Sequence, residues 1–188
     1  GAISFKCFVV FFLSSGALFS QGSVVAFGNS NTGGNIASVS GLNSGVTQIF
    51  STEEAFAALK SDGSVVSWGP SDYGGDSSSV SGLDSGVTQI FSTQKAFAAL
   101  KSDGSVVSWG PSDYGGDSPS SLSGVTQIFS NPYSFAALKS DGSVVSWGNS
   151  SNGGNSPSSL SGVTQIFSTG GAYAALKSDG SVVSWGNS

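Results

Sequence analysis

The sequence predicts an all-β repeat fold, and one recurring segment provides most of the evidence. The segment Ala58–Gly69, which reads ALKSDGSVVSWG, returns nearly unchanged at 99–110, 137–148 and 175–186, and in altered form at 17–28. The glycines that close these copies, at positions 28, 69, 110, 148 and 186, are 41, 41, 38 and 38 residues apart. A nearly fixed period of this size indicates an array of structural units, either a solenoid or a propeller.

The repeats use almost all of the 188 residues, so we expect a single repeat domain. An aromatic content of 11% and a moderate share of proline and glycine are typical of a chain that folds rather than of a disordered one. The expected units are 1–28, which has diverged, 29–69, 70–110, 111–148 and 149–188.

The first unit has two interpretations. Its apolar run Cys7–Leu13 follows one lysine and precedes small residues, as at the end of a secretory signal, although it is too short to span a bilayer. The alternative is a diverged first repeat, in which aligning Gly22 with Gly63 places Phe8 on Ile49. We favour the repeat because this register holds without a gap to the end of the unit.

Each regular unit is expected to contain three strands. The first is Gly45–Ser51, where β-branched and aromatic residues dominate between turn-forming residues. The second and third are Ala55–Lys60 and Ser64–Trp68, and the Asp62–Gly63 pair between them predicts a hairpin with a tight type I′ turn. Equivalent turns are expected at Asp103–Gly104, Asp141–Gly142, Asp179–Gly180 and, in weaker form, Gln21–Gly22.

Both faces of these strands carry apolar side chains. Along the second strand, Phe56 and Ala58 share one face while Ala57 and Leu59 share the other, so we expect every sheet to be covered on both sides. The tryptophan of the third strand is then a core side chain, whose burial contributes roughly 2 to 3 kcal/mol per unit. We prefer this structural role to ligand stacking for all four of them: Trp68, Trp109, Trp147 and Trp185.

The charge inventory excludes several functional classes. The chain has six lysines, no arginine and eleven acidic residues, for a formal charge of −5, whereas a nucleic-acid partner normally needs a basic surface. We therefore expect no nucleic-acid partner, and no membrane contact except through the apolar N-terminal run. Because there is no histidine, the usual general base and the commonest metal ligand are missing, and we expect no catalytic residue and no cofactor.

The segments between the repeats are the candidate interaction loops. They run from Pro70 to Ser85, from Pro111 to Ser123 and from Asn149 to Ser161, and they differ in length and residue type, as loops along a binding rim do. A tyrosine beside glycines there offers a flat face and a hydroxyl to a partner side chain or a sugar. The candidate partner-binding residues are Asp72, Tyr73, Asp76, Asp113, Tyr114, Asp117, Asn152 and Asn155.

Carboxylates are the remaining candidates for chemistry. The aspartate of each hairpin turn is explained by its turn role. Calcium ligation is a weaker alternative for the loop acids, since their spacing matches neither an EF-hand nor a calcium β-roll and the third copy has asparagine instead. We assign no metal, and the residues of the calcium alternative are Asp72, Asp76, Asp113 and Asp117.

The repeat resembles a known family. The pattern Val46-x-x-Ile49, then Ala58-Leu59-Lys60-x-Asp62-Gly63-x-Val65-x-x-Trp68-Gly69 and Gly74-Gly75, is similar to the repeat of the regulator of chromosome condensation superfamily. Its short period resembles the bacterial branch that includes the β-lactamase-inhibitory propeller proteins. The resemblance implies one propeller blade per unit.

This chain departs from the family pattern in two respects. It has five units at most, where family propellers usually have seven blades, and it has Gly-Gly where the family has Gly-Gln. We therefore expect a β-propeller or partial propeller of about five short blades, with a β-solenoid as the alternative that the uneven period and the hairpin turns fit less well. The nucleotide-exchange activity of one branch is not carried over, because its rim residues have no counterpart that we can locate.

The sequence thus predicts a non-catalytic scaffold that binds a protein or a glycan through its inter-repeat loops. A second hypothesis is a structural building block that self-associates into a filament or larger complex, because a short array leaves an uncharged edge strand, Ser181–Trp185. A carbohydrate-active enzyme using the loop carboxylates is a third, weaker hypothesis. Low charge and abundant serine, glycine and threonine favour an extracellular or cell-surface location without fixing the compartment.

Overall fold

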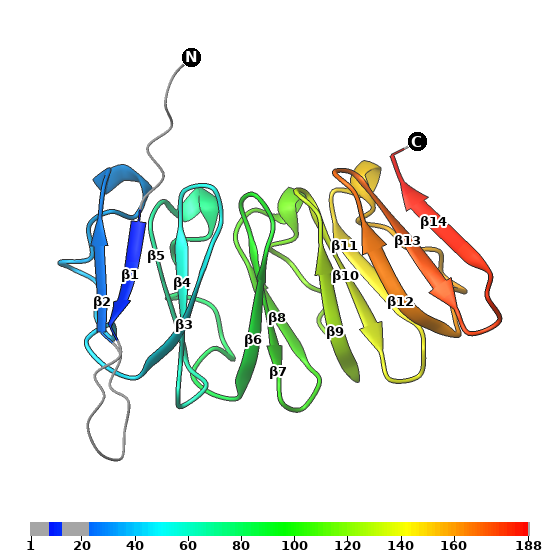
Figure 1. Cartoon of the computed structure of the whole chain (residues 1–188), viewed down its shortest axis with the longest axis horizontal. Coiled ribbons are helices and arrows are strands. Elements are labelled where there is room, and N and C mark those ends of the chain that lie inside the picture. Colours follow the sequence, from blue (N-terminus) through cyan, green and yellow to red (C-terminus); the bar gives the residue numbers. More distant parts are fainter. Residues whose placement is uncertain (1–7, 13–22, 188) are drawn as a thin grey trace.

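A computed structural model describes residues 8–12 and 23–187, which form one two-stranded sheet followed by four three-stranded sheets. The sheets stand side by side in chain order along the longest axis of the molecule (Figure 1). All pairings are antiparallel, and each three-stranded sheet is built from consecutive strands with the second strand in the middle. The all-β class and the three strands in each regular repeat are as the sequence predicts.

The strands are β1 Phe8–Phe12, β2 Ser23–Phe27, β3 Val46–Ser51, β4 Phe56–Lys60, β5 Val65–Trp68, β6 Val87–Ser92, β7 Phe97–Lys101, β8 Val106–Trp109, β9 Val125–Ser130, β10 Ser134–Lys139, β11 Val144–Gly148, β12 Val163–Ser168, β13 Ala172–Lys177 and β14 Val182–Gly186. One-turn 3-10 helices follow the third strand of a unit, and they are η1 Ser30–Thr32, η2 Ser71–Tyr73, η3 Ser112–Tyr114 and η4 Ser150–Asn152.

A β-bulge in the first strand pair of each three-stranded sheet is held by a threonine. In the sheet of β3–β5 the register shifts between Val46 and Gln48, so Thr47 has no partner residue across the pair. Its Oγ1 instead donates to the Leu59 carbonyl oxygen at 3.0 Å. The side chain therefore satisfies a carbonyl that the bulge takes out of the ladder. The same bond recurs from Thr88, Thr126 and Thr164.

The hairpin turns differ from the predicted type. The Lys60 N–H donates to the Ser64 carbonyl and the Gly63 N–H donates to the Lys60 carbonyl, both at 2.9 Å, with Gly63 at φ +77°. These bonds close a three-residue loop that ends in a left-handed glycine, rather than the two-residue type I′ turn. The Asp62 carboxylate favours the longer loop because it accepts from the N–H and the hydroxyl of Ser64, at 2.9 and 2.6 Å.

The hydrophobic core lies between the sheets, and each sheet contributes to two layers of it. Ala57 and Leu59 pack in a cluster with Ile90, Phe97 and Trp109 of the following sheet. The other face of β4 packs in the preceding cluster, together with residues of the first sheet. The alanines of the middle strands β4, β7 and β10 are 0% exposed, and their small size lets neighbouring sheets approach closely. Coverage of both faces is what the apolar pattern predicts.

The repeated tryptophans fasten each sheet to the segment before it. Trp109 is 2% exposed, stacks on Phe97 with ring centroids 5.2 Å apart, and donates from Nε1 to the Gly74 carbonyl at 3.0 Å. The other three make the equivalent bond, to Gly33, Gly115 and Gly153. An indole N–H buried with a partner stabilises this joint, whereas one without a partner would be costly. The exposed fractions of Trp68, Trp147 and Trp185 are 2%, 4% and 9%.

The first sheet does not follow the gapless register of the sequence alignment. That alignment matches Phe8 with Ile49, which lies on an outer strand, but β1 pairs directly with β2 and sets Phe8 opposite Phe27. The signal-like interpretation and the Gln21–Gly22 turn fall mainly on residues 1–7 and 13–22, which lie outside the described residues. No helix among the described residues is long and apolar enough to cross a membrane.

Candidate functional site

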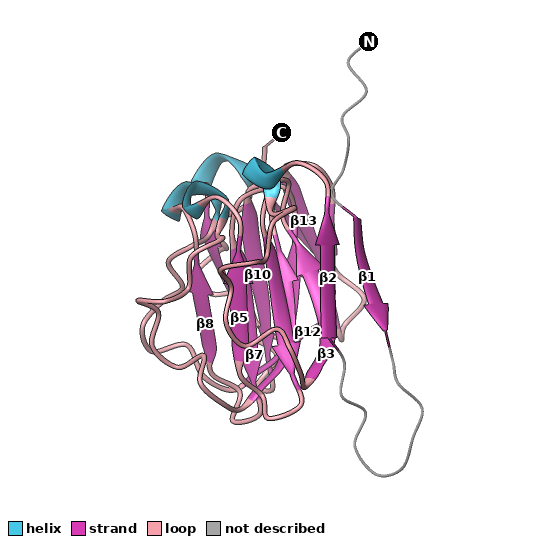
Figure 2. Ribbon diagram, turned by 90° about the vertical axis from the view of Figure 1, so that its left-hand side faces the viewer, coloured by secondary structure: helices cyan, strands magenta, loops and turns pink. Residues whose placement is uncertain are grey.

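The 3-10 helices gather at one end of the strands and form a rim (Figure 2). Each is closed by a left-handed glycine. At η2, Gly74 has φ +81° and donates to the Ser71 carbonyl at 3.1 Å, while the Gly75 N–H donates to the Pro70 carbonyl at 2.9 Å. A Cβ on Gly74 would lie 2.9 Å from a ring carbon of Phe97, so only glycine fits between this loop and the next sheet. The Gly-Gly pair therefore has a packing role.

The last residue of each of the helices η2, η3 and η4 is fixed through its backbone by the sheet beside it. Thr52 Oγ1 donates to the Tyr73 carbonyl and Thr93 Oγ1 donates to the Tyr114 carbonyl, both at 2.9 Å. In the next unit, Asn131 Nδ2 makes the corresponding bond to the Asn152 carbonyl at 2.8 Å. The backbone is thus the same in each unit, while the side chain that it presents changes.

Tyrosine and lysine side chains line this rim in one continuous row. The ammonium of Lys95 lies 4.6 Å from the ring centroid of Tyr73 and 5.2 Å from that of Tyr114. The Tyr114 ring lies 5.8 Å from the ring of Tyr133, with 41° between their planes. All four side chains are half-buried. We call Tyr73, Lys95, Tyr114 and Tyr133 the tyrosine row.

The tyrosine row keeps its lysine charged. Partial desolvation lowers the pKa of the Lys95 amine, but Tyr73, Tyr114 and the Asp72 carboxylate raise it further, so the pKa lies above the ordinary value of 10.5. A cation held over two aromatic faces is attracted by the quadrupole of each ring. At neutral pH the row therefore presents a positive charge close to two tyrosine rings.

Sequence analysis missed Lys95 and Tyr133 because they lie between the first and second strands of their units. That connection is on the same rim, since the start of β7 pairs with the end of β8 at Phe97 and Trp109. A position-by-position comparison of the units contains the signal, because Glu54, Lys95, Tyr133 and Gly171 occupy one repeat position and all differ. Variation at one position of an otherwise uniform repeat marks a binding surface.

The connections that carry these variable residues are joined through their backbones. The Glu53 N–H donates to the Gln94 carbonyl at 2.9 Å, and the Gln94 N–H donates to the Pro132 carbonyl at 3.0 Å. Consecutive units thus hold their variable positions at a fixed spacing along the rim. A partner in contact with several units meets a surface that is already ordered, which lowers the entropic cost of binding.

The other predicted candidates are placed in different ways. Asp72 and Asp113 are exposed in η2 and η3, beside the tyrosine row. Asp76 is exposed and accepts from the Ser78 N–H at 2.9 Å, and the side-chain and backbone hydrogen bonds of Ser78 lower its pKa. Asn152 has a structural role, since its Nδ2 donates to Asn149 Oδ1 at 2.9 Å. Asp117 and Asn155 are exposed in their loops.

The acidic side chains do not gather into a metal site. Among the described residues, no group of three or more histidine, cysteine, aspartate or glutamate side chains lies close enough to hold a metal ion. An open groove of about 670 Å³ borders β5 between two inter-repeat segments, and Asp76 and Asp84 are among its lining residues. Serines and small apolar residues make up most of the remaining lining.

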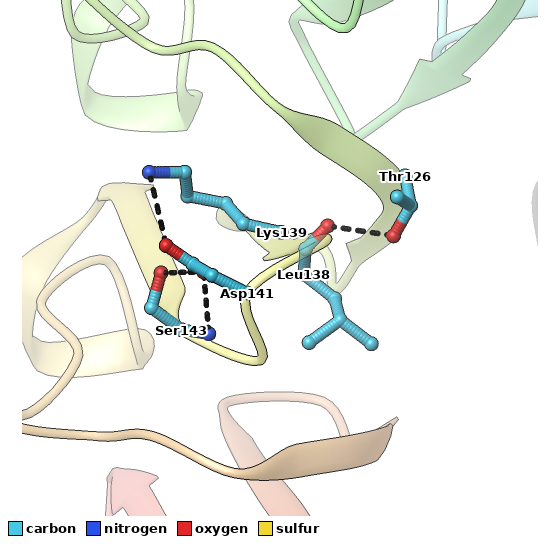
Figure 3. Close-up of polar contacts among 5 residues, drawn as sticks. All are labelled: Thr126, Leu138, Lys139, Asp141 and Ser143. Carbon is cyan, nitrogen blue, oxygen red and sulfur yellow. Dashed lines mark hydrogen bonds and ion pairs between the residues drawn. The ribbon is translucent and has the colours of Figure 1, made fainter.

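The opposite rim carries the hairpin turns, whose carboxylates accept hydrogen bonds within the turn, as Figure 3 shows for Asp141. Asp141 Oδ1 accepts from the backbone N–H of Ser143 at 2.9 Å and from its hydroxyl, and Oδ2 lies 3.9 Å from the Lys139 ammonium. The hydrogen bonds from Ser143 are the main cause of the lowered pKa of Asp141. A carboxylate with a lowered pKa is a poor general base, and its bonds within the turn account for the aspartate at this position.

Comparison with known proteins identifies the repeat. Residues 125–153 match the family model of the regulator of chromosome condensation (RCC1) repeat. No curated protein matches the chain in sequence. Among solved structures, yeast RCC1 (Prp20) bound to Kap60 is similar, with a TM-score of 0.55 and 23% identity over 75% of this chain and 43% of that chain.

Two further structures share the fold. The ectodomain of the Physcomitrella patens receptor kinase CR4 has a TM-score of 0.59 and 18% identity, over 95% of this chain and 49% of that chain. Human WBSCR16 has a TM-score of 0.52 and 18% identity, over 95% and 62%. The chain thus spans about half the length of the structures that it resembles. The open antiparallel sheets and these neighbours show a fold consistent with a partial propeller, in which residues 125–153 match the RCC1 repeat.

Proposed function

We propose that this chain is a non-catalytic interaction module that binds another protein through the tyrosine row. The observation that carries the proposal is the row itself, in which variable side chains lie next to one another on a backbone that is uniform from unit to unit. Tyrosine supplies a large contact area at a low cost in conformational entropy, and tyrosine is enriched at the centres of protein interfaces.

The chemistry of the row favours a protein over a glycan. A sugar stacks on an open aromatic face, but the Lys95 ammonium already lies over the rings of Tyr73 and Tyr114. A protein side chain has other ways to engage this surface, because an acidic group pairs with the ammonium and accepts hydrogen bonds from the tyrosine hydroxyls. We therefore expect a partner with an acidic or amide-rich segment, and glycan binding is the weaker alternative.

The structural neighbours support an interaction role. The yeast RCC1 structure was solved with Kap60 bound, and Prp20p from Saccharomyces cerevisiae was described with its binding properties to Gsp1p and histones. Those partners belong to those proteins, and the identities of 23% and 17% relate this chain to them by fold alone. The shared fold supports a scaffold that presents loops to other proteins.

The proposal is tested with the double variant Tyr73→Ala and Tyr114→Ala, immobilised next to the unchanged protein. The matched control is Ser102→Ala with Ser140→Ala, two exposed serines at the opposite rim. Proteins of the source organism are captured on all three and quantified by mass spectrometry. We expect at least one protein to be retained by the unchanged chain and the control and to fall about tenfold or more on the tyrosine variant. Equal retention of every captured protein on all three would refute the proposal.

The remaining hypotheses rest on other surfaces. Self-association through the uncharged edge strand Ser181–Trp185 remains the second hypothesis. An enzyme acting on carbohydrate would depend on Asp72, Asp76, Asp113 and Asp117, and calcium binding on the same residues. The extracellular or cell-surface location remains a prediction from composition.

A further inference from the structure

The open groove beside β5 lies between the two longer inter-repeat segments. Residues from 29–44 line one wall and residues from 70–85 line the other, and β5 lies between them. These two segments contain 16 residues each, whereas 111–123 and 149–161 contain 13. We call this site the β5 groove. The extra length of its walls distinguishes it from the corresponding surfaces beside β8 and β11.

The two walls are held by the same kind of turn. In one, the Val39 N–H donates to the Ile36 carbonyl, and in the other, the Val80 N–H donates to the Ser77 carbonyl, both at 3.0 Å. Val39 and Val80 are half-buried and line the groove from opposite sides. The walls are therefore ordered by their own hydrogen bonds, which lowers the entropic cost of binding a ligand between them.

The outer edge of β5 directs backbone groups into this groove. β5 is the last strand of its sheet, and the Val65 N–H points away from β4 because it donates to the Leu83 carbonyl at 2.9 Å. Alternate residues of a strand direct their backbone groups to the same side, so the Ser67 backbone also points outward. No hydrogen bond among the described residues uses the Val65 carbonyl or the Ser67 N–H. One acceptor and one donor of β5 are therefore open to a ligand.

The same two groups are already bonded in a unit with a shorter segment. Beside β11, the Ser156 hydroxyl donates to the Val144 carbonyl at 3.3 Å and accepts from the Ser146 N–H at 3.2 Å. Ser77 holds the position of Ser156 in the unit of β5, but it makes neither bond to the described residues. A single serine thus closes the strand edge in one unit, and the longer segment leaves that edge open in the other.

Carboxylates give the β5 groove a negative charge. Asp76 and Asp84 line it and are exposed, and none of the described residues that line it is a lysine. Hydrogen bonds from Ser78 lower the pKa of Asp76, which keeps this carboxyl ionised at neutral pH. The segment of the opposite wall has asparagine at both corresponding positions, Asn35 and Asn43. The charge of the groove therefore favours a ligand with a positive group.

We propose that the β5 groove binds an extended peptide segment of a partner protein that carries a lysine or an arginine. The segment adds to β5 as a further strand, in which one N–H donates to the Val65 carbonyl and one carbonyl accepts from the Ser67 N–H. Its basic side chain pairs with Asp76 and Asp84. Backbone pairing supplies affinity for any extended segment, and the carboxylates supply the preference for a basic one. No residue of the tyrosine row lines the groove, so this proposal is independent of the proposed function.

The experiment begins with short phage-displayed peptides of random sequence, selected on the unchanged protein. Enriched peptides are synthesised with a fluorescent label, and their affinities are measured by fluorescence anisotropy. The groove variants are Asp76→Asn and Asp84→Asn, which reproduce the asparagines of the opposite wall. Asn35 accepts from the Ala37 N–H at 2.9 Å as Asp76 does from Ser78, so the local fold is preserved.

We expect enriched peptides with a basic residue whose affinity falls about three- to fivefold on each groove variant, as for an exposed ion pair. Glu53→Gln removes one exposed carboxylate outside the groove and is the charge-matched control, with affinity unchanged. A selection that enriches no peptide overturns the proposal. So does a set of enriched peptides of which none discriminates the groove variants from the control.

Two backbone measurements test whether the segment adds as a strand. N-methyl groups placed along the peptide are expected to abolish binding where the N–H faces β5 and to be tolerated at the neighbouring positions. Hydrogen exchange of the Ser67 amide, followed by NMR, should slow about tenfold or more in the complex. The Ser146 amide, already bonded to Ser156, is the internal control and should not change. A bound peptide that tolerates a methyl at every position, or that leaves the Ser67 exchange rate unaltered, would overturn strand addition.

Discussion

At the scale of single residues, one tyrosine shows how a sheet is fixed to its neighbour. Tyr173 is 1% exposed and stands where the three preceding units have phenylalanine. Its hydroxyl donates to the Ser134 carbonyl at 2.6 Å, and Ser134 stands where the other units have alanine. Burial raises the pKa of Tyr173 from 10.0 to about 12, because the phenolate would lose its hydration. The two polar replacements therefore act as a pair.

We expect Tyr173→Phe to lower the free energy of unfolding by about 1 kcal/mol at pH 7, the net value of one buried hydrogen bond. A group whose pKa is raised on folding stabilises fully below its unfolded pKa, so the Tyr173 contribution is lost as pH rises from 10.0 toward about 12. The variant should therefore lose stability less steeply than the unchanged protein over this window. Urea unfolding at several pH values measures both effects, with the half-buried Tyr133→Phe as control. Parallel curves for Tyr173→Phe and the unchanged protein would contradict this account.

Burial of the tryptophans could be predicted from the sequence, but their hydrogen-bond partners could not. A large aromatic at a fixed place in an apolar strand of every repeat has to be core. The partner of Trp109 Nε1 is a backbone carbonyl 35 residues upstream, at Gly74, and backbone groups leave no signature in a sequence. Lys95 was missed for a different reason, since a single variable residue between two strands has no pattern of its own.

At the scale of elements, each hairpin turn is held by a carboxylate at the opposite rim. Asp62, Asp103, Asp141 and Asp179 each accept from the N–H and the hydroxyl of the serine two residues later. The hydrogen bonds from that serine are the main cause of the lowered pKa at all four sites. The turns are therefore linked to the acid stability of the protein.

We expect acid to destabilise the fold through these turns. A carboxyl whose pKa is lowered on folding stabilises above its unfolded pKa of 3.8, and the contribution is lost as pH falls through the lower folded pKa, between about pH 5 and pH 2. The quadruple variant Ser64→Ala, Ser105→Ala, Ser143→Ala and Ser181→Ala removes the hydroxyl bonds and should flatten this decline. Thermal melts at stepped pH measure it, and Ser102→Ala with Ser140→Ala is the control. An unchanged slope in the quadruple variant would rule out the serines as its cause.

The strands were easier to predict than the turns that join them. Alternation of apolar residues and the flanking turn residues place β4 and β5 almost to the residue. The Asp-Gly pair is compatible with both a two-residue and a three-residue hairpin loop. Which loop forms depends on which backbone carbonyl accepts the hydrogen bond that closes the turn. Here the hydrogen bond between Ser64 and Asp62 favours the longer loop. One contact between two side chains leaves no sequence pattern that distinguishes the two loop types.

At the scale of the whole molecule, identical residues differ in what covers them. Leu100 lies on the face that packs against the next sheet and is 6% exposed, while Leu176 holds the same position in the sheet of β12–β14 and is half-buried. In a repeat array, stability is roughly a sum of unit and nearest-neighbour contributions. Truncating each leucine in turn therefore separates the free energy that a neighbouring sheet contributes from the free energy that the unit itself contributes.

We expect Leu100→Ala to lower the free energy of unfolding by about 2 to 4 kcal/mol, because it leaves a cavity between two packed sheets. Leu176→Ala should cost about 1 kcal/mol, because Leu176 is only half-buried and its truncation removes less buried apolar surface. Denaturant unfolding of the two variants and the unchanged protein measures both losses. Similar losses at the two positions would mean that neighbouring sheets contribute little.

The repeat period and the coverage of both faces predict separate sheets in a row, but the sequence does not contain the number of sheets needed to close a ring. That number depends on the small rotation between neighbouring sheets. The rotation is the sum of many small contacts between those sheets. The first sheet illustrates the limit, since its gapless alignment with the second repeat did not predict that β1 pairs directly with β2.

Pro132 makes the array mechanically uneven. The backbone hydrogen bonds that join the rim connections run from the Glu53 N–H to the Gln94 carbonyl and from the Gln94 N–H to the Pro132 carbonyl. Proline has no N–H, so Pro132 cannot pass this series on to the last unit. Bending that opens the rim is resisted by backbone at the earlier joints and by side chains such as Tyr173 at the last one. Of the joints between the three-stranded sheets, the last therefore lacks this backbone bond, and a partner seated on Tyr133 would lie beside it.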